Sequence, residues 1–247
     1  MSAGRELPPG ALHSPTAYSR GVRGWALPED FEALTPEEAG ALQQELAGCV
    51  REEDEAGEPL LIAGVDAAYD ARGGTAHGGA VLWSLAERRV VETAVASRPT
   101  LAPYRPGYLA WRELPAVLAA LRRLRRRPDL VLVDGHGRAH PRRCGLACLL
   151  GLALELPTIG CGKSVLVGGC SGLGATRGSA APLRDRGEVV GAAVRTRTGV
   201  RPVYVSVGHR VTLAGACALV LSTSRFRIPE PLRAADAAGR RRLARLA

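Results

Sequence analysis

The stretch of sequence that decides the fold reads LLIAGVD at residues 60–66, a short apolar run that ends in the carboxylate of Asp66. A second stretch, LVLVD at residues 130–134, repeats the pattern and ends in Asp134. Short apolar runs of this kind are typical of buried strands. If the two strands lie in one sheet, their carboxylates form a group of hard oxygen ligands that suits Mg²⁺. The alternative is that each aspartate simply begins a turn, as aspartate often does.

The segments around these two runs predict a mixed sheet. We expect helices at residues 35–50, 109–125, 141–154, 213–221 and 230–246, and further strands at 78–85, 89–96, 158–160, 189–195 and 203–207. Residues 168–187 are rich in glycine, and we expect little regular structure there. Three antiparallel strands followed by alternating helices and strands predict an α/β fold, with helices on both faces of one mixed sheet.

The first 34 residues differ from the rest of the chain. They contain several prolines and glycines and no periodic apolar face, so we expect residues 1–34 to be a disordered extension. Thr35 followed by Pro36 and two acidic residues is typical of a helix start. Because no repeat or linker follows, we expect residues 35–247 to form a single domain.

The composition favours a nucleic-acid partner. The chain has 247 residues, a net charge of +9 and a sequence pI near 9.9, and basic proteins attract polyanions. The argument is weakened because Lys163 is the only lysine, and an arginine excess of this kind also results from GC-rich codons. No apolar run reaches the length of a membrane helix, about 18 residues. With neither a signal peptide nor a disulfide scaffold in the pattern, we expect a cytoplasmic protein.

Two other clusters have competing interpretations. His136, His140, Cys144 and Cys148 recur every four residues, which is a spacing that zinc ligands can use. Glycines and Pro141 interrupt a helix there, so we favour core cysteines over a zinc site. The arginine-rich residues 122–127 can bind phosphate or form a solvated helix end.

An aromatic and basic loop, PYRPGY at residues 103–108, precedes the second expected helix. The ordinary interpretation is a proline–glycine turn whose aromatic rings pack inward. The functional interpretation is an element that stacks on bases or inserts between them.

Six stretches, taken in order, resemble the endonuclease V family, which cuts nucleic acid near deaminated adenine. They are IAGVD (62–66), PYRPGYLAWRE (103–113), VDGHGRAHPRR (133–143), PTIGCGK (157–163), PVYVSVGH (202–209) and RIPEP (227–231). Together they span about residues 60–235, in the family's order. The resemblance implies a ribonuclease H-like fold and a cluster of carboxylates that binds Mg²⁺, for which Mn²⁺ can substitute.

The resemblance also implies roles for individual residues. Asp66, Asp134 and Glu113 match the family's metal-binding carboxylates, Lys163 a lysine near the reacting phosphate, and His209 a catalytic histidine. Pro103, Tyr104, Pro106 and Gly107 match a wedge that fills the gap left by a flipped base. Leu109, Gly135, His140 and Gly160 match positions that line a hypoxanthine pocket. Arg112, Arg142 and Arg143 lie within the matching stretches and are candidate phosphate ligands.

The activity implied is hydrolysis of the second phosphodiester bond 3′ to the deaminated base, which leaves a 3′-hydroxyl and a 5′-phosphate. We expect a monomer whose partner is DNA that contains deoxyinosine, with inosine-containing RNA as the alternative. Two rival interpretations remain: a nucleic-acid-binding module without catalysis, and a metal-dependent nuclease for branched DNA on the same fold.

Overall fold

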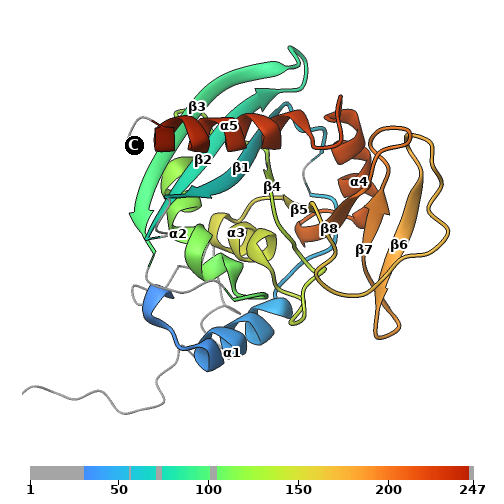
Figure 1. Cartoon of the computed structure of the whole chain (residues 1–247), viewed down its shortest axis with the longest axis horizontal. Helices are drawn as coiled ribbons and strands as arrows, with labels where there is room; N and C mark the ends of the chain where they lie inside the picture. Colours follow the sequence, from blue (N-terminus) through green and yellow to red (C-terminus); the bar gives the residue numbers. More distant parts are fainter. Residues whose placement is uncertain (1–30, 56, 71–73, 101–104, 245–247) are drawn as a thin grey trace, which may run out of the picture.

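The computed structural model describes residues 31–55, 57–70, 74–100 and 105–244. An eight-stranded sheet in the order β3-β2-β1-β4-β5-β8-β7-β6 runs through them (Figure 1). The strands are β1 (Leu61–Tyr69), β2 (Thr75–Ser84), β3 (Arg89–Pro99), β4 (Leu130–Val133), β5 (Thr158–Gly162), β6 (Ala180–Asp185), β7 (Glu188–Val194) and β8 (Val203–His209). Strands β1, β4 and β5 run parallel, and the other neighbours are antiparallel. The predicted α/β sheet of ribonuclease H-like type is thus confirmed.

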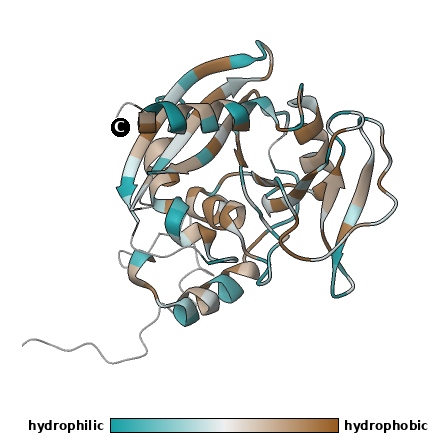
Figure 2. Cartoon of the chain, viewed as in Figure 1, coloured by the Kyte–Doolittle hydropathy of each residue, from teal (hydrophilic) through white to brown (hydrophobic). Residues whose placement is uncertain are grey.

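Helices cover both faces of the sheet, as predicted. They are α1 (Pro36–Ala47), α2 (Leu109–Leu121), α3 (Leu146–Leu154), α4 (Leu213–Ser222) and α5 (Glu230–Ala244). Side chains alternate along a strand, so Val131 and Val133 of β4 pack with α2 and α3. Leu130 and Leu132 pack on the other face, with residues of α4 and α5. Figure 2 shows hydrophobic colour on α3 and hydrophilic colour along α1 and α5, which lie on the outside.

The first helix begins where the sequence predicts. The Thr35 hydroxyl accepts a hydrogen bond from the Glu38 backbone N–H at 3.2 Å, and the Glu38 carboxylate accepts one from the Thr35 backbone N–H at 2.9 Å. This capping box satisfies two backbone donors that the helix itself leaves unpaired. The helix ends at Ala47.

The boundary predicted at residue 34 is too late. Phe31 lies in a short 3-10 helix, η2 (Phe31–Ala33), and its side chain is buried. Its ring stacks on Trp111 of α2 with 4.9 Å between ring centroids. The core therefore includes residue 31. The disorder expected for residues 1–30 concerns a segment that lies outside the described residues.

Two expected elements differ in the structure. The helix expected from Pro141 begins at Leu146, because residues 135–145 form tight turns that are hydrogen-bonded to β8 and to each other. The glycine-rich stretch contains β6, which forms a hairpin with β7 through Arg186 and Gly187, both with positive φ. Proline at position 182 is tolerated because β6 is an edge strand. Across the described residues, no helix is long and apolar enough to cross a membrane.

Candidate active site

The two predicted aspartates lie side by side on neighbouring strands. Val65 of β1 pairs with Val133 of β4, and the Asp134 backbone N–H donates to the Val65 carbonyl at 3.0 Å. Asp66 is not at a strand end as expected, since β1 continues to Tyr69 against β2. It lies instead where the shorter strand β4 stops. The parallel register brings Asp66 and Asp134 together.

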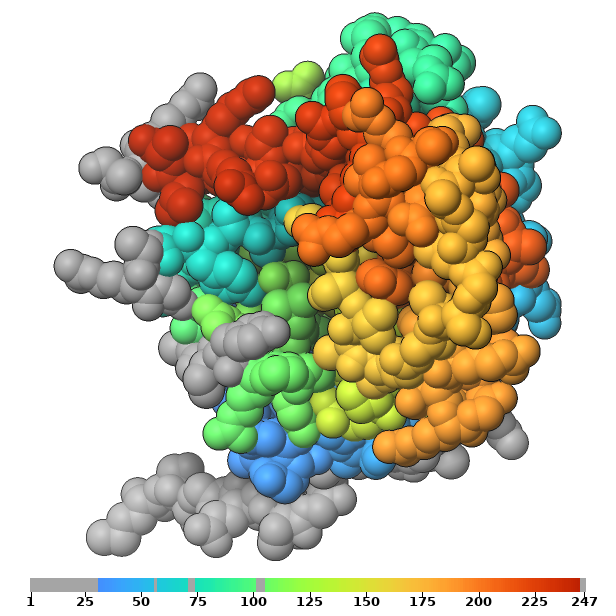
Figure 3. All heavy atoms as spheres, turned by 45° about the vertical axis from the view of Figure 1, so that its right-hand side comes forward, coloured from blue at the N-terminus to red at the C-terminus, as the bar shows by residue number. Residues whose placement is uncertain are grey.

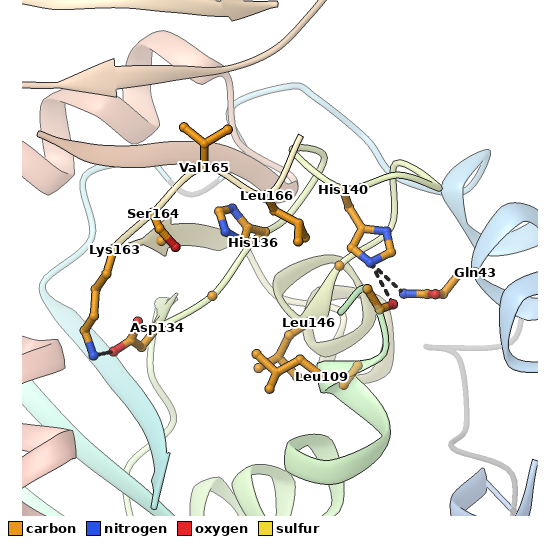
Figure 4. Close-up of a pocket in the computed structure, with 15 residues that line it drawn as sticks. Gln43, Leu109, Asp134, His136, His140, Leu146, Lys163, Ser164, Val165 and Leu166 are labelled. Atoms are coloured by element: carbon orange, nitrogen blue, oxygen red, sulfur yellow. Dashed lines mark hydrogen bonds and ion pairs between the residues drawn. The ribbon is translucent and has the colours of Figure 1, made fainter. Parts of the chain in front are cut away.

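Lys163 supplies a positive charge to this pair. It directly follows β5, and its Nζ forms an ion pair with Asp134 (Figure 4). The same Nζ lies 4.0 Å from Oδ2 of Asp66. Burial and the charge of Asp134 raise the pKa of Asp66 to about 8. Burial alone would lower the pKa of Lys163, but its hydrogen bond to Asp134 and the charges of Asp134, Asp66 and Asp236 together outweigh that effect and raise it. If both aspartates were ionised, the site would hold more negative charge than one lysine neutralises, which is why Asp66 retains its proton to a higher pH.

Glu113 is the third predicted carboxylate, and it enters from α2. Its side chain is buried, and burial together with the charge of Asp66 raises its pKa well above the usual range. Its Oε1 accepts a hydrogen bond from the Tyr69 hydroxyl at 3.0 Å. The structure thus brings Glu113 within electrostatic range of Asp66 and Asp134.

Asp236 on α5 is a residue that the sequence analysis missed. Its charge contributes to the raised pKa values of both Asp66 and Lys163. Figure 3 shows α5, in red, lying beside β1, in teal, on this face of the molecule. The available signal was weak: an acidic residue within an alanine- and arginine-rich helix, where it also pairs with Arg240 at i+4.

A divalent cation fits this donor set. Among the described residues, no three Asp, Glu, His or Cys side chains form a ready-made cage. Mg²⁺ does not need one, because it keeps several waters and binds one or two carboxylates together with substrate phosphate oxygens. The buried, adjacent oxygens of Asp66 and Asp134 already attract the Lys163 ammonium. His136, His140, Cys144 and Cys148 all lie in the described part of the chain, and no three metal-ligating side chains gather there.

The burial of Asp66 predicts how stability depends on pH. Its pKa is raised from 3.8 to about 8 in the folded protein. The stability that the protonated Asp66 carboxyl contributes to the folded protein is therefore fully present below pH 3.8. That contribution is lost as the pH rises through about 8. We expect Asp66→Asn to become more stable relative to wild type over this range when melting temperatures are measured in a chelator. A difference that stays constant with pH would contradict this origin of the shift.

The structure does not bring His209 to the carboxylates. It pairs with Thr158 at the start of β5, whereas Lys163 follows the end of that strand. Five residues of strand separate the two positions by about 16 Å, at about 3.3 Å per residue. His209 is buried, its Nδ1 accepts a hydrogen bond from the Arg51 backbone N–H at 3.2 Å, and burial lowers its pKa to about 4. Because the register places it far from the cluster, we do not retain the catalytic role expected for it.

A pocket of about 230 Å³ opens beside the cluster (Figure 4). Its lining joins catalytic candidates to predicted base-binding residues, and includes Gln43, Gly107, Leu109, Asp134, Gly135, His136, His140, Leu146, Lys163 and Val165. Gly160, on β5, packs against the loop at residues 135–137 that lines the pocket, and is not itself one of the lining residues. A Cβ there would lie 2.5 Å from the Gly137 backbone nitrogen, so Gly160 allows the loop at 135–137 to sit close to β5.

His140 is a neutral side chain that hydrogen-bonds to the backbone carbonyl of Gly107. Burial lowers its pKa to about 4, and its Nδ1 accepts a hydrogen bond from the Arg142 backbone N–H at 3.2 Å. The proton is therefore on Nε2, which donates to the Gly107 carbonyl at 2.9 Å. Gly107 is buried and Pro106 is exposed. Pro103 and Tyr104, the other predicted wedge residues, lie outside the described residues.

The arginines expected to bind phosphate are engaged within the protein. Arg142 donates to the Gln43 side chain at 2.7 Å and to the Gly107 carbonyl at 2.6 Å, with its guanidinium 4.2 Å from the Tyr108 ring centroid. Arg143 forms ion pairs with Asp185 and Glu188 at 2.9 and 2.7 Å. The Arg112 guanidinium lies over the ring of Tyr69. We assign all three arginines structural roles, in place of the phosphate contacts that were expected.

Arg142→Ala tests this assignment. We expect a loss of about 2 kcal/mol or more in stability, because hydrogen bonds to charged groups contribute about 1.5–3 kcal/mol. The slope of log affinity against log salt for DNA should stay unchanged, since each lost phosphate contact would reduce it by about one. The control is Arg126→Ala, which changes an exposed arginine and should not alter the melting temperature. A shallower salt slope for Arg142→Ala would restore the phosphate role.

Over most of its length, the chain is similar to proteins of one family. The family model described as Endonuclease V matches residues 44–237. The Endonuclease V of Roseiflexus castenholzii is 51% identical over 201 residues, which cover 81% of this chain and 90% of that protein. The crystal structure of the Streptomyces avermitilis Endonuclease V is 46% identical, with a TM-score of 0.82 over 86% of this chain and 94% of that one.

A structure of the Ciona intestinalis Endonuclease V holds a 24mer DNA that contains an inosine followed by a ribo-adenosine. It is 26% identical to this chain, with a TM-score of 0.75, and the match covers 85% of this chain and 98% of that one. The family model and the Roseiflexus relative each cover most of the sequence. This chain therefore belongs to the endonuclease V family.

Proposed function

We propose that this protein cuts nucleic-acid strands beside deaminated adenine, as a step of DNA repair. It hydrolyses the second phosphodiester bond 3′ to the lesion and leaves a 3′-hydroxyl and a 5′-phosphate. The observation that carries the proposal is that Asp134 and Lys163 belong both to the carboxylate cluster and to the wall of the pocket. One site can therefore hold a base and cleave a phosphodiester nearby.

The chemistry needs charge neutralisation and an activated water. Mg²⁺, or Mn²⁺ in its place, supplies both when it is bound. Asp66 on β1 and Asp134 just after β4 would hold it, together with Glu113 of α2, whose carboxyl is electrostatically coupled to both aspartates. The Lys163 ammonium, half-exposed beside Asp134, is placed to offset the charge of the scissile phosphate. Lysine suits this task as a compact point charge on a flexible stem.

The pocket suits an extruded purine. A base cannot be read at its Watson–Crick edge while it is stacked and paired, so it must leave the duplex. Leu109 and Leu146 give the pocket apolar walls, while the backbone at Gly135 supplies polar groups. Hypoxanthine presents an N1–H donor and an O6 acceptor, and adenine presents the reverse. Fixed backbone groups can discriminate between these two patterns without any charged side chain.

DNA is the substrate that we favour. The Ciona relative binds a 24mer DNA that contains an inosine followed by a ribo-adenosine, and the net charge of +9 suits either nucleic acid as a polyanion. The test uses end-labelled strands with one inosine, as DNA and as RNA, beside a four-way junction and an adenosine control. We expect faster incision of deoxyinosine DNA than of the other three. Preferred cutting of RNA or of the junction, or binding without cleavage in Mg²⁺, would select one of the alternative functions.

A further inference from the structure

Tyr69 reaches the carboxylate cluster from the opposite face of β1. Side chains alternate along a strand, so Tyr69 and Asp66, three residues apart, leave on different faces. Asp66 shares its face with Gly64, which packs directly against α5. Tyr69 shares the other face with Val65 and Ala67, which belong to the same apolar cluster as α2. Tyr69 therefore lies between β1 and the helix that carries Glu113.

The phenol of Tyr69 is bonded to the buried carboxylate. Its O–H donates to Oε1 of Glu113 at 3.0 Å, and the Glu113 residue is only 6% exposed. A buried carboxylate is costly unless hydrogen bonds compensate for the lost water. It can also rotate about its side-chain torsions unless a partner fixes it. The hydroxyl of Tyr69 meets both needs.

The Tyr69 ring is itself held in place. The guanidinium of Arg112, the residue before Glu113 on α2, lies 4.4 Å from the ring centroid. A cation over an aromatic face is attracted to it, so this contact holds the ring against α2. The ring is thus fixed by Arg112 on its face and by Glu113 at its hydroxyl, while β1 fixes its Cα.

We propose that Tyr69 is a positioning residue that orients the Glu113 carboxylate toward the divalent cation held by Asp66 and Asp134. The inference rests on the proposed function, in which Glu113 is the third carboxylate of the cluster. Partners that hydrogen-bond to metal ligands fix their orientation, and their loss typically costs about 10- to 100-fold in metal affinity or activity. Tyr69 does this through its hydroxyl and needs no direct contact with metal or substrate.

The test measures Mn²⁺ binding to the full-length protein, as wild type and as Tyr69→Phe. Electron paramagnetic resonance of the free ion detects how much Mn²⁺ is bound. The change removes the hydroxyl and keeps the ring over which Arg112 lies, so we expect a folded protein. We expect about tenfold weaker Mn²⁺ binding and a matching rise in the Mg²⁺ concentration needed for half-maximal incision. Because Tyr69 acts through Glu113, adding Tyr69→Phe to Glu113→Gln should weaken binding no further.

Ser97→Ala is the matched control. It also removes a hydroxyl from the same sheet, one that lies 2.9 Å from His77 Nδ1 outside the site, and it should leave Mn²⁺ binding unchanged. Wild-type affinity in Tyr69→Phe, or additive losses in the double variant, would overturn the inference. If Glu113→Gln also binds Mn²⁺ normally, Glu113 is not a ligand and the inference falls with that assignment. A different outcome would refute the proposed function itself: wild-type protein that does not cut inosine strands at all.

Discussion

Asp134→Asn is expected to lose at least about a thousandfold in incision rate while the protein stays folded. A metal ion is worth several kcal/mol of transition-state stabilisation, and each 1.36 kcal/mol is a factor of ten in rate. Asparagine keeps the size of the side chain but removes the negative charge that faces Lys163. Single-turnover incision of a deoxyinosine strand in Mg²⁺ measures the loss, and the melting temperature reports on the fold.

Glu87→Gln is the control for this loss. It removes a carboxylate from the exposed turn between β2 and β3, where Glu87 pairs only locally with Arg89. Its incision rate should equal that of wild type. Asp66→Asn should behave like Asp134→Asn, since both carboxylates flank the same cation site. Near-normal incision by either aspartate variant would rule out the assigned metal site.

Gly64→Ala is expected to displace α5 from the sheet and to reduce both stability and incision. A Cβ at Gly64 would lie 2.3 Å from the carbonyl oxygen of Pro231, and backbone cannot move aside as a side-chain tip can. Overpacking of a core typically costs about 1–3 kcal/mol and occasionally more. For a chain of this size, each kcal/mol lowers the melting temperature by about 2–4 °C. Incision should fall as well, because α5 carries Asp236 and covers Asp66.

Gly74→Ala makes the same chemical change where there is space. Among the described residues, nothing lies within 4 Å of a Cβ at Gly74, so its melting temperature and incision rate should match those of wild type. If the melting temperature of Gly64→Ala equals those of Gly74→Ala and wild type, the tight contact between β1 and α5 is not needed for the fold.

The sequence predicts the centre of this fold well because its signals there are local. Two apolar runs of strand length each lead to an aspartate, and strand pairing then places Asp66 beside Asp134. The helix start at Thr35 is equally local, since cap and first turn lie within four residues. Such features depend on neighbours in the chain, which a single sequence displays.

The features that the sequence does not predict depend on packing between distant segments. Asp236 approaches Asp66 only because α5 lies across β1, and helical periodicity carries no sign of that. His209 is the last residue of a matching stretch, but the register of β8 on β5 puts it beside the start of β5, at the opposite end of that strand from Lys163. Phe31 is one of three widely spaced aromatic residues in the proline-rich residues 1–34, a spacing that forms no pattern, yet its ring stacks on Trp111 in the core.

Mapping the cut site on one 5′-labelled DNA strand with a single deoxyinosine tests the central claim most directly. The claim is that the carboxylate cluster and the adjacent pocket form one site that reads hypoxanthine and cleaves beside it. We predict a single Mg²⁺-dependent product that ends in a 3′-hydroxyl at the second phosphodiester bond 3′ to the lesion. The product should be absent in a chelator and with deoxyadenosine in place of deoxyinosine. Equal cutting of the deoxyadenosine strand, or cutting that persists in the chelator, would contradict the account.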